Sequence, residues 1–196
     1  MYSAFAQHFH ETRYKPWPGV VSFLQSLPSA SRILDLGCGN GKYLGIRRDC
    51  IQHACDPCAA LVDIAQSQHP SIDILVADGS HLPYKSKSMD AVISIAVFHH
   101  VQPEEQTRFL KEVDRVLETD GLFFATVWNP AAVRPSWEYR GNHCHMVPWH
   151  DKEGRVHERL YYIYEMSEIQ AIFGAFFTIL EIREECNNWY ITCRKL

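Results

Sequence analysis

The sequence has none of the features that mark several large classes of protein. Its apolar runs fall well short of the ~20 residues that a transmembrane helix needs, and its first fifteen residues are too polar for a signal peptide. No stretch resembles a linker, a repeat or a low-complexity tract. A chain of 196 residues can bury a core of its own. We therefore expect a single domain that spans residues 1–196.

Positive charge is also scarce. The formal net charge is −4, whereas affinity for nucleic acid rests largely on lysine and arginine. A uniformly basic surface is therefore excluded, and a local basic face is what remains open. The cations that could form one are scattered along the chain, and they include Arg134, Arg140, Arg155 and Arg159.

The cysteines do not form a pattern that stabilises small secreted domains. There are seven, an odd number without regular spacing, which favours a reducing compartment, cytosolic or nuclear. Cys55 and Cys58 have metal-ligand spacing, but no second pair follows, and the run His143-Cys144-His145 lies on an irregular segment. Because a zinc site needs a complete ligand set, we predict no metal.

What the sequence does contain is a glycine loop after a short apolar run. Residues 32–43 read RILDLGCGNGKY. Glycines at alternate positions let the backbone adopt positive φ and approach a ligand closely. A helix expected over residues 41–48 would direct its first N–H groups toward a carboxylate or phosphate. The segment therefore predicts a cofactor loop.

Two better-known glycine loops do not fit these residues. The dinucleotide fingerprint needs a third glycine where Lys42 stands, and the P-loop needs Ser or Thr where Tyr43 stands. The pattern Asp35-x-Gly37-x-Gly39-x-Gly41 instead resembles the first motif of class I S-adenosylmethionine-dependent methyltransferases. In that family the loop holds the methionine end of the cofactor.

Two further acids follow strand-like segments. Asp56 ends IQHACD, where a doubly wound sheet places a carboxylate on ribose hydroxyls. Asp78 ends IDILVAD, where these methyltransferases commonly read the adenine edge. The alternative is that each acid caps the next helix, since Asp is a favoured N-cap residue. Three acids at three successive strand ends favour the cofactor site.

The order of apolar segments predicts the fold class. We expect strands over residues 32–36, 51–56, 72–77, 90–96 and 121–128, and helices over residues 18–27, 41–48, 58–68 and 103–118, the last closed by Gly121. This alternation indicates a parallel sheet covered on both faces. FFTILEIR and NNWYITCRKL predict a final antiparallel hairpin. The class is α/β: a Rossmann-like class I methyltransferase fold with a seven-stranded, mostly parallel sheet.

Residues 129–160 are rich in Trp, His, Arg and Pro and have no clear period. A long segment without its own pattern is often functional. It follows the fifth strand, where the carboxyl ends of parallel strands leave a crevice for ligands. We interpret it as a substrate-side insertion.

Several stretches are more selective than the glycine loop. They resemble stretches of the eukaryotic tRNA wobble-uridine carboxymethyl methyltransferases, and they read HFHETRYKPWP, VADGSHLPYKSKSMDAVISIAVFHHV, VPWH, RLYYIY and NNWYITCRK. Those enzymes esterify 5-carboxymethyluridine at position 34 to give 5-methoxycarbonylmethyluridine. The resemblance covers nearly the whole chain and implies S-adenosyl-L-methionine as cofactor and the tRNA anticodon loop as substrate.

The resemblance also implies site residues. Arg13, His99, His100 and Trp149 would act on the acceptor, with Arg13 offering a planar fork for a carboxylate. Because adjacent residues at a strand end diverge, we expect one histidine to pack inward and the other, with a slight preference for His100, to face the site. Substrate contacts would come from Lys15, Tyr43, Asn188 and Trp189, although core packing is an equal alternative for Trp189. The cofactor would contact Asp35, Gly37, Gly39, Asn40, Gly41, Asp56, Asp78, Gly79 and Ser94.

The chain departs from that family in having few residues before TRYKPWP and almost no basic insertion after VPW. Family members work with a small zinc-binding activator protein that pairs with an edge strand, which here would be IDILVAD. Three rivals stay open: methylation of a small molecule or protein, a non-catalytic subunit with the same fold, and a uridine C5-methyltransferase that uses a cysteine nucleophile.

Overall fold

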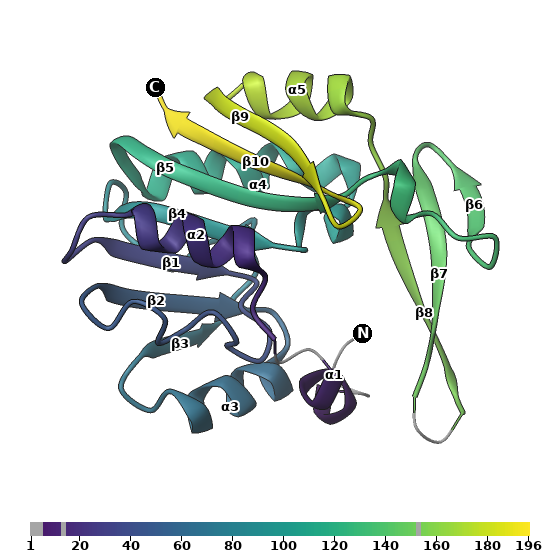
Figure 1. Cartoon of the computed structure of the whole chain (residues 1–196), viewed down its shortest axis with the longest axis horizontal. Helices are drawn as coiled ribbons and strands as arrows, with labels where there is room; N and C mark the ends of the chain where they lie inside the picture. The colour runs from purple at the N-terminus through teal and green to yellow at the C-terminus, as the bar shows by residue number, and fades with distance from the viewer. Residues whose placement is uncertain (1–5, 13–14, 152–153) are drawn as a thin grey trace.

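The computed structural model describes residues 6–12, 15–151 and 154–196. The strands of its main sheet are β1 (Arg32–Leu36), β2 (Ile51–Asp56), β3 (Asp73–Val76), β4 (Met89–Ile95), β5 (Leu117–Trp128), β9 (Phe177–Glu185) and β10 (Asn188–Lys195). Their order is β3-β2-β1-β4-β5-β10-β9 (Figure 1). The first five in that order run parallel, and β10 is antiparallel to both neighbours. The predicted mostly parallel sheet with a C-terminal hairpin is confirmed.

Helices cover both faces of this sheet, as Figure 1 shows. They are α2 (Pro18–Ser26), α3 (Ala59–Gln68), α4 (Pro103–Val116) and α5 (Met166–Gly174), whereas α1 (Ala6–Thr12) packs against α3. Two short 3₁₀ turns are η2 (Phe98–His100) and η3 (Pro130–Ala132). The apolar residues of α2 pack with Ile33 and Phe124 on one face, and those of α4 and α5 pack with Leu34 and Phe123 on the other. No helix within the described ranges is long and apolar enough to cross a membrane.

Helix α4 forms where the periodicity predicted it, but it ends earlier. Pro103 stands at its first turn with Glu104 and Glu105, which suit the positive end of the helix dipole. The chain turns into β5 at Leu117, so Gly121 lies inside that strand and does not close the helix. A Cβ at Gly121 would come within 2.8 Å of the Glu118 carbonyl oxygen, which explains glycine at this bend.

The helix expected over residues 41–48 is absent, and turns occupy residues 41–45. Gly41 and Gly45 both have positive φ, +78° and +76°, and such residues interrupt a right-handed helix. The prediction of a helix N-terminus aimed at an anionic ligand is therefore wrong. The glycine loop must act through its own backbone and through the acids beside it.

The segment after β5 contains regular strands, although its sequence shows no clear period. Residues 129–160 include β6 (Glu138–Gly141), β7 (Cys144–His150) and most of β8 (Val156–Tyr162), which form an antiparallel sheet of order β6-β7-β8. In Figure 1 this sheet projects from the end of β5 and faces α1 across the carboxyl ends of the parallel strands. Its alternation escaped detection because Arg159, a charged residue, holds a buried position on β8.

Candidate functional site

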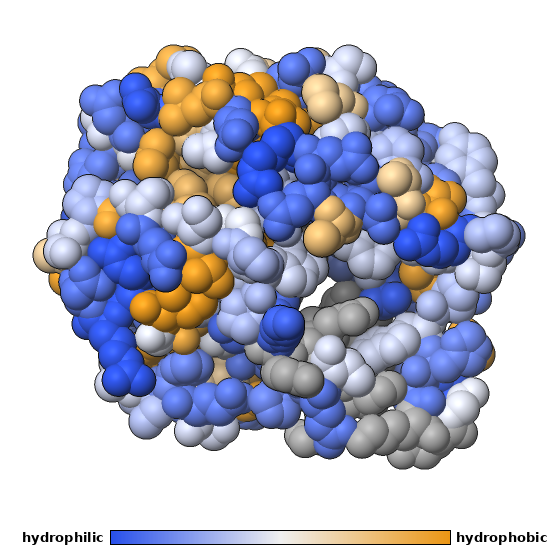
Figure 2. Space-filling view, viewed as in Figure 1, coloured by the Kyte–Doolittle hydropathy of each residue, from blue (hydrophilic) through white to orange (hydrophobic). Residues whose placement is uncertain are grey.

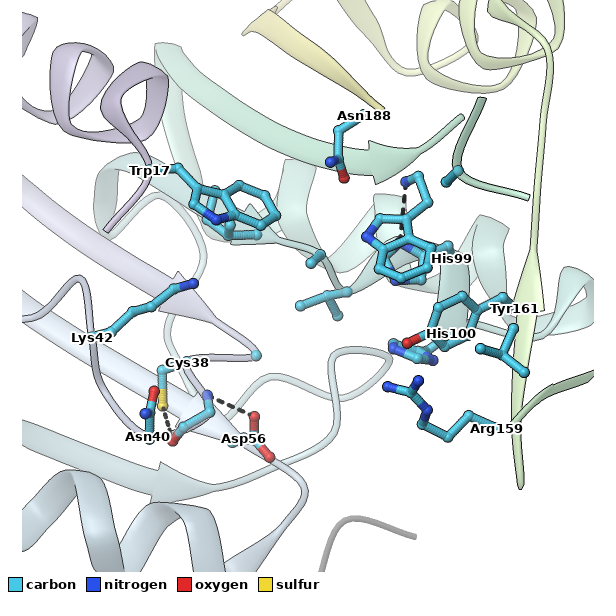
Figure 3. A pocket seen from close by; sticks show the side chains of 18 of the residues that line it. Trp17, Cys38, Asn40, Lys42, Asp56, His99, His100, Arg159, Tyr161 and Asn188 are labelled. Carbon is cyan, nitrogen blue, oxygen red and sulfur yellow. Dashed lines mark hydrogen bonds between the residues drawn. The ribbon is translucent and has the colours of Figure 1, made fainter. Parts of the chain in front are cut away.

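A cavity of about 530 Å³ lies between the carboxyl ends of the parallel strands and the β6-β7-β8 sheet. The space-filling view shows the molecule hollowed at this place (Figure 2). The residues that line the cavity come from the loop after β1, the ends of β2 and β4, η2, the end of β5, β8 and the start of β10. Figure 3 shows two groups of side chains facing each other across it: Asn40, Lys42 and Asp56 on one side, and His99, His100 and Arg159 on the other.

The glycine loop forms one wall of the cavity. Gly37, Gly39 and Gly41 have φ values of +78°, +54° and +78°, which only glycine adopts without strain. A Cβ on Gly37 would lie 2.4 Å from a Val97 methyl carbon. The N–H groups of Gly37 and Cys38 donate to the Cys55 carbonyl at 2.8 and 3.0 Å. The loop is thereby folded tightly against the end of β2.

Two carboxylates stand behind this loop. Asp35 is buried, its Oδ2 has no partner among the described residues, and burial together with the charge of Asp56 raises its pKa to about 7. Asp56 accepts the Gly39 N–H through Oδ2 and the Cys58 N–H through Oδ1, both at 2.9 Å. Both acids line the cavity. Because a buried carboxylate without a partner is costly, this wall suits a cation.

Asn40 links the loop to the N-terminal helix. Its Nδ2 lies 3.2 Å from Nδ1 of His10, on α1. Beside it, Lys42 places its ammonium 4.9 Å from the ring centre of Trp17 and 4.8 Å from that of Tyr43. Asn40, Lys42, Tyr43 and Trp17 all line the cavity.

The opposite wall is aromatic and contains a buried arginine. Arg159 is 6% exposed, and its guanidinium carbon lies 5.1 Å from the ring centre of Tyr161 and 5.3 Å from that of Trp149. Its Nε has no hydrogen-bond partner, and no carboxylate of the residues that the structure describes pairs with it. Arginine is buried only rarely without an anion. This end of the cavity therefore suits an anionic ligand.

The two histidines of AVFHH lie in η2 and not at the end of β4. Their rings are 4.5 Å apart and tilted by 49°, and both line the cavity. The expectation that one would turn away from the other is wrong, because a 3₁₀ turn does not alternate its side chains as a strand does. Burial lowers the pKa of both, well below the usual value for His99 and to about 4 for His100. Both are neutral near pH 7.

Hydrogen bonds fix the protonated nitrogen of each ring. The backbone N–H of Trp128 donates to Nδ1 of His99 at 3.3 Å, so a neutral His99 carries its proton on Nε2 and can donate from there. Nδ1 of His100 lies 3.3 Å from the Leu160 carbonyl oxygen. Because a carbonyl only accepts, neutral His100 carries its proton on Nδ1. The geometry favours His99 as the donor to a ligand, whereas the sequence slightly favoured His100.

Other residues that the sequence singled out lie elsewhere. Those outside the described cavity lining are Lys15, Gly41, Asp78, Gly79, Ser94, Trp149 and Trp189. Asp78 is exposed and accepts the Ser80 N–H at 2.7 Å, as a capping residue does. Trp189 belongs to the core and donates its indole N–H to the Tyr164 carbonyl at 2.9 Å. Arg13 lies outside the described residues.

The structure gives a reason for the identity of Gly79 and places the other three residues. A Cβ on Gly79 would lie 2.5 Å from the Phe109 ring, so glycine there permits packing against α4. Ser94 is completely buried within β4. Trp149 is half-buried, and its ring centre lies 5.3 Å from the guanidinium carbon of Arg159, which lines the cavity. Lys15 is exposed.

Sequence reasoning missed several residues that line the cavity. Arg159 was considered only as one of several scattered cations, and Trp17, Trp128 and Tyr161 were not singled out. Trp17 nevertheless stands inside the quoted stretch HFHETRYKPWP, and Arg159 and Tyr161 stand inside RLYYIY. The signal that could have found Arg159 is a charged residue that shares the buried face of a strand with Tyr161, two positions later.

The residues present fit S-adenosylmethionine. Its sulfonium and ammonium groups suit the unpartnered Oδ2 of Asp35. Asp56 stands at the end of β2, where a carboxylate meets ribose hydroxyls in doubly wound sheets. Gly37 admits close approach of a ligand to the backbone. The particular contacts stay predictions.

Comparisons with known proteins agree with this site. A family model described as a methyltransferase domain matches residues 34–125. The chain is 45% identical to the tRNA (carboxymethyluridine(34)-5-O)-methyltransferase of Arabidopsis thaliana, over 65% of this chain and 31% of that protein. The chain therefore spans about a third of that longer relative.

A second relative matches over nearly its whole length. The chain is 33% identical to the tRNA (carboxymethyluridine(34)-5-O)-methyltransferase of Schizosaccharomyces pombe, covering 100% of this chain and 94% of that protein. Among solved structures, the putative methyltransferase in a complex with the Haloferax volcanii Trm112 methyltransferase activator has the same fold, with a TM-score of 0.73 at 18% identity over 99% of this chain and 95% of that one. The chain thus belongs to the tRNA (carboxymethyluridine(34)-5-O)-methyltransferase family.

Proposed function

We propose that this chain transfers the methyl group of S-adenosylmethionine to the carboxylate of 5-carboxymethyluridine at the wobble position of tRNA, in the cytosol or nucleus. The product is 5-methoxycarbonylmethyluridine. The names of the relatives support the substrate, and the methyltransferase domain supports the reaction class.

The observation that carries the proposal is the buried guanidinium of Arg159. It lines the same cavity as the glycine loop, without a carboxylate partner in the described part of the chain. An acceptor that brings its own carboxylate would complete an ion pair there, and arginine's planar fork matches a carboxylate in two parallel hydrogen bonds. An uncharged acceptor would leave the arginine unpaired.

The chemistry asks little else of the protein. Methyl transfer is a displacement in which the acceptor oxygen forms a bond to the methyl carbon while the bond from that carbon to sulfur breaks, and the cofactor when bound supplies the methyl group. A carboxylate is already ionised near pH 7, so no general base is required. The protein must orient the carboxylate and exclude water. Arg159 and neutral His99 can do this without protonating the nucleophile.

Arg13 stays a second candidate for the same task. It belongs to the stretch TRYKPWP, which also contains Trp17 at the cavity wall. We propose that Arg13 contacts the acceptor from the N-terminal side. Arg13→Ala should then reduce transfer and leave cofactor affinity unchanged, whereas loss of cofactor affinity would assign it to the donor side.

A cysteine nucleophile for attack on the uracil ring finds little support. Cys38 lines the cavity, but it is buried within the glycine loop. Burial and the nearby Asp35 raise the pKa of its thiol, and the thiolate is the reactive form. The uridine C5-methyltransferase hypothesis is therefore less favoured.

We further propose that a small zinc-binding activator docks on β3. This strand is an edge of the main sheet, and its last residue, Val76, is 57% exposed. An apolar edge strand is suited to pairing with a strand of another protein. Co-expression with the activator should raise soluble yield, and Val76→Lys should abolish that gain without unfolding the chain, because the side chain is already exposed.

The decisive experiment tests the acceptor. The full chain, with and without the activator, is incubated with methyl-labelled S-adenosylmethionine and with tRNA that bears or lacks 5-carboxymethyluridine. We expect base-labile label on the modified tRNA alone, because only an ester is cleaved by mild base. Label on unmodified tRNA, or on a metabolite while the modified tRNA stays unlabelled, would reject the proposal. Absence of cofactor binding in calorimetry would indicate a non-catalytic subunit.

A further inference from the structure

Asn188, the first residue of β10, presents an unusual group to the cavity. It is 3% exposed and lines the cavity. Its amide oxygen Oδ1 is buried and has no hydrogen-bond partner within residues 6–12, 15–151 and 154–196. Figure 3 shows the amide pointing into the cavity between Trp17 and His99. A buried acceptor without a donor is exceptional in folded proteins.

The orientation of this amide is fixed by its other end. Nδ2 donates to the Cys186 carbonyl oxygen at 2.8 Å, and a carbonyl cannot donate, so an exchange of oxygen and nitrogen would place two acceptors against each other. Cys186 and Asn187 have φ values of +51° and +60°, as in the tight hairpin turns that join two strands. The turn therefore fixes the position of the Cys186 carbonyl group. The hydrogen bond to that carbonyl fixes the orientation of the Asn188 side-chain amide.

The position of Asn188 assigns it to the acceptor and not to the cofactor. β10 is three strands away from β1 in the sheet, past β4 and β5, which is about 14 Å at the usual strand spacing. The glycine loop and Asp56 follow β1 and β2. Asn188 lies opposite Trp128 in the register of β10 with β5, and the Trp128 ring centre is 5.6 Å from that of His99. Its amide oxygen therefore faces the half of the cavity that contains the aromatic wall.

We infer that Oδ1 of Asn188 accepts the N3–H of the uracil ring and so selects uridine over cytidine. This inference rests on the proposed function, because it needs a pyrimidine acceptor in this half of the cavity. Uracil carries a donor at N3, whereas cytosine carries an unprotonated acceptor at the same position. A cytosine would place a second lone pair against a buried oxygen that cannot turn away. A methyl group at N3 would likewise remove the donor and fill its space.

The wild-type chain allows a test that does not depend on any variant. Transfer is measured on 5-carboxymethyluridine, its N3-methyl derivative and 5-carboxymethylcytidine, each as the same short anticodon stem-loop. We expect uridine to exceed both analogues by at least about tenfold, the factor that one lost buried hydrogen bond produces. Equal rates on all three would overturn the inference and leave the proposed function standing. No ester on any of them would overturn the proposed function itself.

The variant Asn188→Leu tests the residue. Leucine keeps a similar volume and removes the acceptor, so we expect the rate on uridine to fall by about tenfold or more while the uridine-to-cytidine ratio falls toward one. Asn129→Leu is the matched control, because Asn129 is 1% exposed, has a similarly unpartnered Oδ1 and lies outside the described cavity lining. It should keep the wild-type ratio even if its melting temperature falls. A preserved ratio in Asn188→Leu, or its loss in Asn129→Leu, would contradict the inference.

Discussion

The two ends of the cavity differ in their charged groups and arise from the sequence in different ways: both acids that line it lie at the end that also holds Lys42, and Arg159 lies at the other. The donor end contains Asp35 and Asp56, contributed by the ends of β1 and β2. The acceptor end contains Arg159 and two neutral histidines, from β8 and η2. A cationic methyl donor and an anionic acceptor thus each meet the opposite charge. Ligands of the wrong sign are disfavoured at both ends.

The two ends also differ in how far apart their residues lie in the sequence. The donor end is built within about two dozen residues, from Asp35 to Asp56, so a local motif can specify it. The acceptor end joins His99, Arg159 and Asn188, which come from η2, β8 and β10 and are far apart in the sequence. The same motif can therefore serve many methyltransferases, while the acceptor end determines which substrate is methylated.

The largest effect should come from removing the charge of the acceptor end. Arg159→Ala should lower transfer to the modified tRNA by on the order of 10²–10³ because the substrate carboxylate loses its buried partner. Single-turnover transfer and cofactor affinity by calorimetry are the two measurements, and affinity should not change. Arg155→Ala is the control: Arg155 lies on the same hairpin but its side chain is 67% exposed and pairs with Asp151. An equal loss in the control, or a loss of cofactor affinity in Arg159→Ala, would contradict the division into two ends.

The donor end should respond most to a change in the glycine loop. In Gly37→Ala the added Cβ would lie 2.4 Å from Val97 at a φ of +78°. We expect the free energy of unfolding to fall by about 2–4 kcal/mol and cofactor affinity to fall at least about 30-fold.

Gly45→Ala serves as the control for backbone strain alone. Its φ is +76°, but the nearest atom to the added Cβ lies 3.4 Å away, so a loss of about 1–2 kcal/mol is expected. Chemical denaturation measures both variants. Equal losses would show that Val97 is not responsible, and Val97→Ala combined with Gly37→Ala should recover part of the difference.

The pH dependence of cofactor affinity should distinguish the ends further. Burial and Asp56 raise the pKa of Asp35 from 3.8 to about 7 in the free protein, and a bound cation favours the ionised form. Below pH ~7 binding must release a proton, so affinity should weaken by up to about tenfold for each pH unit of acidification. Calorimetry in buffers of different ionisation enthalpy measures that proton. Asp35→Asn should lose the slope, and Asp78→Asn should keep it.

The raised pKa of Asp35 also makes the free energy of unfolding depend on pH. Between pH ~4 and ~7 the folded chain holds a proton on Asp35 that the unfolded chain has released. The free energy of unfolding of the free protein should therefore decrease as pH rises through this range, and Asp35→Asn should remove that decrease. A stability that rises with pH in the wild type and not in the variant would show that Asp35 is ionised when folded.

The smallest effect is expected at the histidines. Burial lowers the pKa of His100 to about 4 and that of His99 well below 6.5. With saturating cofactor and substrate, kcat should therefore stay constant from about pH 5.5 to 8. An inflection near pH 6.5 that disappears in His100→Gln would show that this histidine is charged during the reaction, and the acceptor end would then carry two cations.

The sequence predicted the sheet well because its strands are short apolar runs and α4 has a clear helical period. It failed at residues 41–48, where the two positive-φ glycines outweigh the helix-forming residues between them. It also failed to find β6, β7 and β8, since hydropathy alternation does not register a buried arginine such as Arg159.

The candidate site follows the same division. Asp35, Gly37, Gly39 and Asp56 were recognised from local spacing and do line the cavity. Asp78 was selected by the same logic, but its exposed carboxylate caps the following turn, which spacing alone cannot distinguish from ligand binding. Asn188 and Trp189 are neighbours in one motif, yet alternation on β10 sends one to the cavity and the other to the core.

By itself the sequence determined the donor: a glycine loop and two acids within one strand-loop-strand unit require no distant partner to be recognised. Only the tertiary structure decided what faces that donor. The isolated guanidinium of Arg159, the tautomers of His99 and His100 and the fixed acceptor of Asn188 all depend on which groups lie nearby across strands. Charge burial and hydrogen-bond satisfaction are properties of an assembled cavity, and a linear pattern does not contain them.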